Sequence, residues 1–131
     1  MELSAKDQVM IAMYTEYMND LPNFKKIKPA AMDMEKGVFH NAVIKLQNEE
    51  LISGAYINLG SRPATNITDI WNAKPTSKGI SYVESLLKIE PELSSADKRK
   101  KILENSSKWV LTQTKDVGSK LLAELIRKSL L

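Results

Sequence analysis

Six residues between positions 36 and 48 carry side chains that could read the bases of DNA. Asparagine can form two hydrogen bonds with adenine, lysine can reach guanine, and an apolar side chain can touch the methyl group of thymine. A polar helix face is also typical of any helix that meets solvent, so both interpretations stay open. The six residues are Lys36, His40, Asn41, Ile44, Lys45 and Asn48, and we expect His40 to be exposed or half-exposed there.

The opposite face of the same stretch is apolar and predicts how the helix is held. At about 100° per residue, four apolar side chains fall on one side of a helix that runs from Lys36 to Asn48. Asp33 stands just before this run, where its carboxylate could cap the first turn. The four core residues are Phe39, Ala42, Val43 and Leu46.

A two-stranded hairpin is predicted after this helix. Residues 55–59 alternate between apolar and polar, which places Ala55, Ile57 and Leu59 on the inner face of a half-buried strand. A turn cluster follows, and residues 67–72 predict the second strand. The tip residues that could contact DNA are Ser61, Arg62 and Asn66, with Arg62 either on a phosphate or minor groove or simply in solvent.

Helices are predicted on both sides of this region. Ser4 can cap a first helix that ends near Asp20, before Pro22. Thr76 can cap a later helix, with Pro75 ending the preceding strand. The first helix is expected to be amphipathic, with an apolar face of Met10, Met13, Tyr14, Tyr17, Met18 and Leu21. Lys25, Lys26 and Lys28 lie in the connector after it, either solvated or near phosphates.

The sequence between residues 35 and 83 also matches a family pattern. That pattern has an F-x-x-A-V-x-x-L helix, an acidic and apolar strand entry, a wing, and an L-T-x-K-G-x-x-Y-L helix start. The matching residues are Phe39, Ala42, Val43, Leu46, Glu49, Glu50, Leu51, Ile52, Thr76, Lys78, Gly79, Tyr82 and Val83, with Pro75 in place of Leu. The run therefore resembles the YjcQ-like family of small winged-helix proteins of Gram-positive bacteria and their prophages. The resemblance implies a winged helix and, through that fold, nucleic-acid binding.

The C-terminal part of the chain differs in charge from the rest. Residues 94–131 hold nine Lys and Arg against four acids, a net charge of +5, whereas residues 1–93 hold ten against twelve, a net charge of −2. We expect a winged-helix domain over residues 1–92 and a helical extension over residues 93–131. The basic run of Lys98, Arg99, Lys100 and Lys101 could contact phosphates or form a solvated helix face.

An apolar stripe near the C-terminus needs a surface to cover it. Its members recur at helical spacing, and such a stripe must pack against another element. It could pack back on the winged helix or pair with the same stripe of a second chain to form a homodimer. The stripe consists of Val117, Leu121, Leu122, Leu125 and Ile126.

Catalytic and metal-binding chemistry is not expected. The chain has no Cys and one His, which removes thiol nucleophiles, disulfides and clustered histidine ligands. No phosphate-binding loop, dinucleotide fingerprint or HExxH helix is present. We therefore predict a cytoplasmic protein with no catalytic residues, no metal, no cofactor and no membrane association, since no apolar run reaches the roughly 18 residues that span a bilayer.

Two functions fit the winged-helix region, and a third possibility is that the C-terminal helices alone act as a dimerisation or basic docking arm. The first is a small α+β, mostly helical, winged helix-turn-helix protein with a two-stranded wing and a C-terminal helical extension, binding double-stranded DNA as a transcriptional or phage regulator. The second is a non-catalytic module that uses the same scaffold to bind a protein partner. The net charge of −2 over residues 1–93 and the apolar Ile44 on a polar face favour the second.

Overall fold

The computed structural model describes residues 2–62, 65–105 and 110–111, and it shows an α+β protein. Four α-helices and one short 3-10 helix lie within the described part of the chain. They are α1 (Ala5–Tyr17), η1 (Phe24–Lys26), α2 (Lys36–Asn48), α3 (Ser77–Leu87) and α4 (Ser95–Asn105). The apolar spacing within residues 36–48 and the Thr76 cap therefore predicted α2 and the start of α3 correctly.

The strands in the described part of the chain form three two-stranded sheets. β1 (Glu2–Leu3) pairs in parallel with β6 (Val110–Leu111), and β2 (Ile52–Ser53) pairs antiparallel with β5 (Lys74–Pro75). β3 (Tyr56–Asn58) and β4 (Ile67–Asp69) form the predicted antiparallel hairpin, with Ile57 opposite Thr68. The β2–β5 pair was not predicted, because Pro75 was expected to end a strand and instead lies opposite Ile52.

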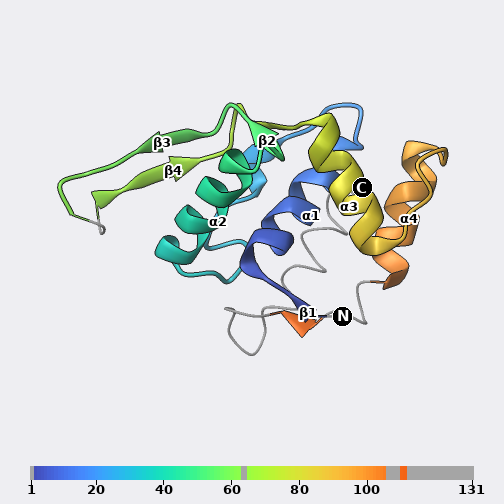
Figure 1. The fold of residues 1–131 in the computed structure, drawn as a ribbon, viewed down its shortest axis with the longest axis horizontal. Helices are drawn as coiled ribbons and strands as arrows, with labels where there is room; N and C mark the ends of the chain where they lie inside the picture. The colour runs from blue at the N-terminus through green and yellow to red at the C-terminus, as the bar shows by residue number, and fades with distance from the viewer. Residues whose placement is uncertain (1, 63–64, 106–109, 112–131) are drawn as a thin grey trace.

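Helix α1 lies at the centre of the molecule, between α2 and α3 (Figure 1). Every residue from Gln8 to Glu16 is buried, so α1 has no solvent face over this length. The prediction of an amphipathic helix was therefore wrong. The helix ends at Tyr17 and not near Asp20, and Leu21, assigned to the apolar face, is 89% exposed.

Helix α2 packs its apolar side on α1 as expected. The four predicted core residues are buried, which confirms the apolar face. The start of the helix differs from the prediction, because Asp33 adopts a left-handed backbone conformation with φ 52° and does not cap it. Glu35 occupies the N-cap position and makes no side-chain hydrogen bond to the first turn.

The entry to α3 is tied to the exit from α2 by the Thr76 junction, which consists of Glu50, Leu51, Thr76 and Gly79. The Thr76 hydroxyl donates to the carbonyl of Glu50 at 2.7 Å and accepts from the amide of Gly79 at 3.0 Å. The Thr76 amide donates to the carbonyl of Leu51 at 3.0 Å. The predicted N-cap therefore also joins two helices, and glycine at position 79 allows their backbones to approach closely.

Charged groups link helix α4 to α1 and α3, and Ile102 of α4 is buried in the core. The Lys98 ammonium lies 2.7 Å from the Glu84 carboxylate, which also accepts a hydrogen bond of 2.8 Å from the Tyr14 hydroxyl. Arg99 donates to the carbonyl of Met18 at the end of α1. Burial, together with the bond to Glu84, raises the pKa of the Tyr14 hydroxyl far above its usual value, because ionisation would place two negative charges side by side.

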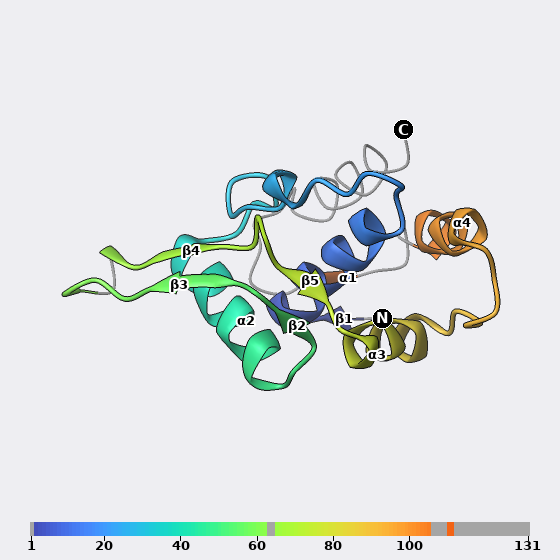
Figure 2. The ribbon, with the colours of Figure 1, turned by 90° about the horizontal axis from the view of Figure 1, so that it is seen from above.

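The hairpin and α4 lie at opposite ends of the molecule. Figure 1 shows β3 and β4 extending away from the helices at one end of the long axis, with α4 at the other. The view turned by 90° agrees: the hairpin projects on one side and α4 lies beyond α1 on the other (Figure 2). The C-terminal extension, as far as it is described, is therefore remote from the hairpin tip.

The Thr76 junction leads to a prediction about two glycines. A Cβ on Gly79 would lie 2.0 Å from the carbonyl oxygen of Leu51, whereas a Cβ on Gly37 meets no atom within 4 Å. We expect Gly79→Ala to lower the free energy of unfolding by roughly 2 kcal/mol, because the backbones must separate. Gly37→Ala should raise it by about 0.5 kcal/mol by restricting the unfolded chain. Urea denaturation followed by circular dichroism measures the free energy of unfolding of both variants. Equal changes in the two variants would contradict the close approach of the backbones at Gly79.

Candidate nucleic-acid interface

The outer side of α2 presents the predicted polar residues to solvent, with one exception. Lys36, Asn41, Lys45 and Asn48 are exposed and Ile44 is half-buried; we call these five residues the α2 ridge. The spacing of four and three residues from Asn41 through Lys45 to Asn48 brings these side chains onto one line along the helix. The α2 ridge can therefore offer amide and ammonium groups to one ligand surface.

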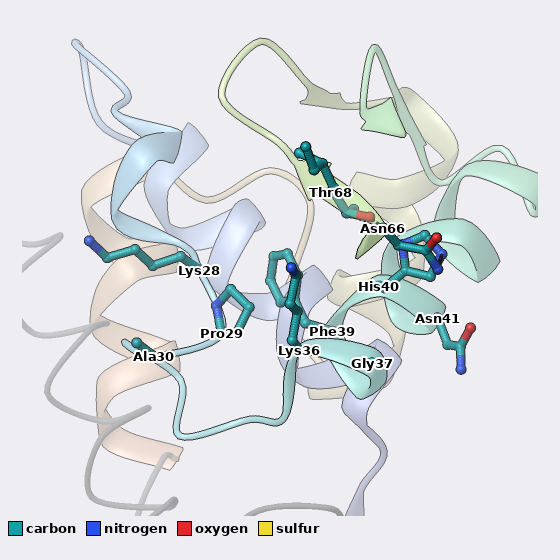
Figure 3. Close-up of a pocket in the computed structure, with 11 residues that line it drawn as sticks. Lys28, Pro29, Ala30, Lys36, Gly37, Phe39, His40, Asn41, Asn66 and Thr68 are labelled. Carbon is teal, nitrogen blue, oxygen red and sulfur yellow. Dashed lines mark hydrogen bonds between the residues drawn. The ribbon is translucent and has the colours of Figure 1, made fainter. Parts of the chain in front are cut away.

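His40 is the exception, because it is buried and turned toward the hairpin. Only 7% of its surface is exposed, so the expectation of an exposed histidine and its assignment to the base-reading face were wrong. Its Nδ1 bonds to the Thr68 hydroxyl on β4, and its Nε2 lies 3.4 Å from the Asn66 side-chain nitrogen. Figure 3 shows His40, Asn66 and Thr68 gathered on the same side of α2. His40 therefore connects α2 to the hairpin.

Asn66 extends this connection to the hairpin tip. Its Oδ1 accepts a hydrogen bond of 3.1 Å from the amide of Gly60, on the opposite arm of the hairpin. In this amide orientation its nitrogen donates to Nε2 of His40, so Nδ1 carries the ring proton and donates to Thr68. Asn66 is half-buried and its polar groups are used within the protein, so its predicted role as a DNA contact is replaced by a positioning role.

The two other predicted tip residues are free to meet a ligand. Ser61 and Arg62 are exposed. The Arg62 backbone is held by Thr65, whose hydroxyl donates to the Arg62 carbonyl at 2.7 Å and accepts from its amide at 3.2 Å. Among the described residues, nothing pairs with the Arg62 guanidinium. The hairpin tip therefore presents the Arg62 guanidinium on a turn that is held by the hydrogen bonds to Thr65.

The hairpin also exposes apolar side chains that were not predicted as functional. Tyr56, Leu59 and Ile67 are 51%, 67% and 51% exposed. Leu59 was assigned to the inner face of the first strand, but β3 already ends at Asn58, so Leu59 lies beyond the part of the hairpin that packs on α2. The alternation of residue types alone could not show where the strand leaves the core.

The basic run on α4 has fewer side chains free to contact phosphates than we predicted from the sequence. The Lys98 side chain is 12% exposed and paired with Glu84, and Arg99 is bonded to the α1 carbonyl of Met18. Both side chains are engaged within the protein, which does not fit their assignment as phosphate contacts. Lys100 is exposed, and Lys101 lies 4.0 Å from Glu90 in a loose surface pair.

The predicted dimerisation stripe lies outside the described residues. It comprises Val117, Leu121, Leu122, Leu125 and Ile126. Within the described ranges, no cluster of three or more His, Asp or Glu side chains is arranged to hold a metal ion. In the same part of the chain, none of the helices combines the length and hydropathy needed to cross a lipid bilayer.

Comparisons with protein-family models, curated proteins and solved structures found no match to this chain.

The buried pairing of Lys98 gives a prediction with a control in the same helix. Lys98→Met removes the charge partner of a carboxylate that is itself nearly inaccessible, so we expect a loss of about 3 kcal/mol in the free energy of unfolding. Lys101→Met removes only the surface pair with Glu90 and should cost less than about 1 kcal/mol. Chemical denaturation measures the difference. Similar small losses in both variants would show that Lys98 does not stabilise the fold.

The link through Asn66 predicts a local effect on the hairpin. Asn66→Ala removes the acceptor of the Gly60 amide and the partner of His40, so amide hydrogen exchange at Gly60 and along β3 and β4 should become faster. The cost in global stability should stay near 1 kcal/mol. Asn58→Ala is a matched control, since among the described residues the Asn58 side chain bonds only to the Tyr56 hydroxyl, at 3.3 Å on the same hairpin. Unchanged exchange in Asn66→Ala would contradict the connection.

Proposed function

We propose that this protein is a small winged-helix DNA-binding protein that acts as a transcriptional or phage regulator in the cytoplasm. The proposal includes membership of the YjcQ-like family, which the residues of α2 and the Thr76 junction suggest. In this assignment α2 is the recognition helix and the β3–β4 hairpin is the wing. The protein has no catalytic role and needs no metal or cofactor.

The exposed α2 ridge is the observation that carries this proposal. Four of its five side chains are exposed, and of the two acids that follow it, Glu49 and Glu50, one is paired. Glu49, the acid next to Asn48, is neutralised by Lys6, whose ammonium lies 2.9 Å from its carboxylate. A duplex could therefore approach along Asn41, Lys45 and Asn48 without meeting an unpaired carboxylate at position 49.

The hairpin supplies the second contact. Arg62 at its tip could enter a minor groove or hold a phosphate while α2 lies in the adjacent major groove. The hydrogen bonds through His40 and Asn66 fix the hairpin relative to α2, so both contacts are presented with a defined spacing. Lys98 and Arg99 take no part in this proposal, and α4 would lie away from the DNA.

A protein partner is the second candidate function, and one observation favours it. Tyr56, Leu59 and Ile67 expose apolar surface on the hairpin, and exposed aromatic and aliphatic groups are typical of protein interfaces. Replacing all three with serine should then abolish partner binding while duplex binding is retained. Loss of duplex binding in that variant would place these side chains in the DNA interface.

DNA binding is tested with the double variant Asn41→Ala, Lys45→Glu. We expect a labelled random duplex of about 30 base pairs to bind with micromolar affinity that weakens as salt rises from about 50 to 200 mM. The double variant should bind at least about tenfold more weakly, because it loses an amide contact and reverses a charge. Fluorescence anisotropy measures both dissociation constants.

The matched control is Lys88→Glu, which makes the same charge change on an exposed residue that follows α3. It should retain the affinity of the natural sequence. Equal losses in the two variants would indicate non-specific attraction by net charge. Affinity that does not respond to salt, or no binding at micromolar concentrations, would overturn the proposed function.

A further inference from the structure

A groove of about 650 Å³ lies between the start of α2, the segment 28–30 and the first residues of β4. Its volume falls within the range of about 300–1,000 Å³ that is typical of small-molecule sites. Figure 3 shows Pro29 and Ala30 on one side of the groove and Asn66 and Thr68 on the other, with Lys36, Gly37 and Phe39 between them. We call it the helix–hairpin groove.

The walls of the helix–hairpin groove are mainly apolar. Pro29, Ala30, Phe39 and Ile67 line it, and Ile67 is 51% exposed. Gly37 also lines it and has no side chain to fill the space, since an added Cβ there would meet nothing within 4 Å. A flat ring or a short hydrocarbon chain could therefore lie against these walls and remove apolar surface from water.

The groove is lined by two lysines, Lys28 and Lys36, and is therefore positively charged. Lys36 lines it, and its ammonium has no hydrogen-bond or ion-pair partner among the described residues. Figure 3 draws Lys36 and Phe39 at the start of α2, and both line the groove. A free ammonium beside an apolar cavity favours an anionic group attached to an apolar body.

Two residues of the first turn of α2, Lys36 and Gly37, line the groove. The first bond of the helix joins the Phe39 amide to the Glu35 carbonyl, and Glu35 offers no side-chain cap. The amides of Lys36, Gly37 and Val38 therefore lack acceptors within the described chain, and the helix dipole makes this end electropositive. By contrast, His40 and Asn66 are bonded to each other, so they form a fixed wall and not a binding group.

We propose that the helix–hairpin groove binds a small amphipathic organic anion, such as an aromatic carboxylate or sulfonate. Its apolar body lies against Phe39, Pro29 and Ile67, and its anionic group bonds to the Lys36 ammonium and the first-turn amides of α2. Lys36 and Asn41 belong to both the groove and the α2 ridge. A bound anion therefore occupies part of the surface offered to DNA and displaces it, a consequence that rests on the proposed function.

Two fluorescent probes that differ by one charged group test the site. Anilinonaphthalene sulfonate has the apolar rings and an anion, whereas phenylnaphthylamine has the same rings without the sulfonate. Lys36→Gln should weaken binding of the sulfonate about tenfold, the loss expected for a charged hydrogen bond, and leave phenylnaphthylamine binding unchanged. Lys88→Gln, which removes an exposed cation that follows α3 and does not line the groove, should change neither.

A second variant tests the place of binding. Gly37→Phe should fill the groove and abolish binding of both probes, and the open space at Gly37 allows it to fold, which thermal denaturation verifies. Sulfonate binding that survives both Lys36→Gln and Gly37→Phe would overturn the proposed site.

A titration of duplex DNA with and without the sulfonate tests the competition. Weaker duplex binding in its presence supports displacement, and unchanged duplex binding overturns it. If the protein binds the sulfonate through Lys36 but does not bind DNA, the proposed function fails while the anion site is supported.

Discussion

The buried carboxylate of Glu84 links three helices of the described chain. A charge removed from water is costly unless other groups compensate it, and here the compensation comes from two other helices, through the Tyr14 hydroxyl and the Lys98 ammonium. If either partner moves away, the Glu84 carboxylate keeps only one of these two compensating contacts. The requirement therefore fixes α3 and α4 relative to α1, and it explains why the most basic part of the chain is partly directed inward.

The features predicted correctly from the sequence are those set by neighbouring residues. The apolar spacing of residues 39–46 predicted α2. Ser4 and Thr76 were predicted to be helix caps, and in the structure each hydroxyl accepts a hydrogen bond from the amide three residues later. The complete burial of α1 could not be predicted, since it depends on contacts from distant segments. Asp33 was misassigned as a cap because its backbone conformation is left-handed, which a residue type does not reveal.

The candidate site was predicted in part for the same reason. Helical periodicity correctly indicated the exposure of Asn41, Lys45 and Asn48. It could not show that the hairpin folds over His40, because that contact joins residues 28 positions apart. The helix–hairpin groove was also missed, since its walls come from three separate segments. Likewise, the sequence could not show that Lys98 is mostly buried, because its burial depends on the ion pair with Glu84 of another helix.

The Thr76 junction affects how far the length of the hairpin can change without disturbing the helices. Together with the β2–β5 pair, it closes residues 54–73 into a loop whose two ends are fixed independently of its tip. For such a loop, doubling the length adds only about 0.6 kcal/mol of closure entropy. Insertions between Leu59 and Asn66 should therefore leave the helices in place, so that the reach of the hairpin can change from one homologue to another while the scaffold is kept.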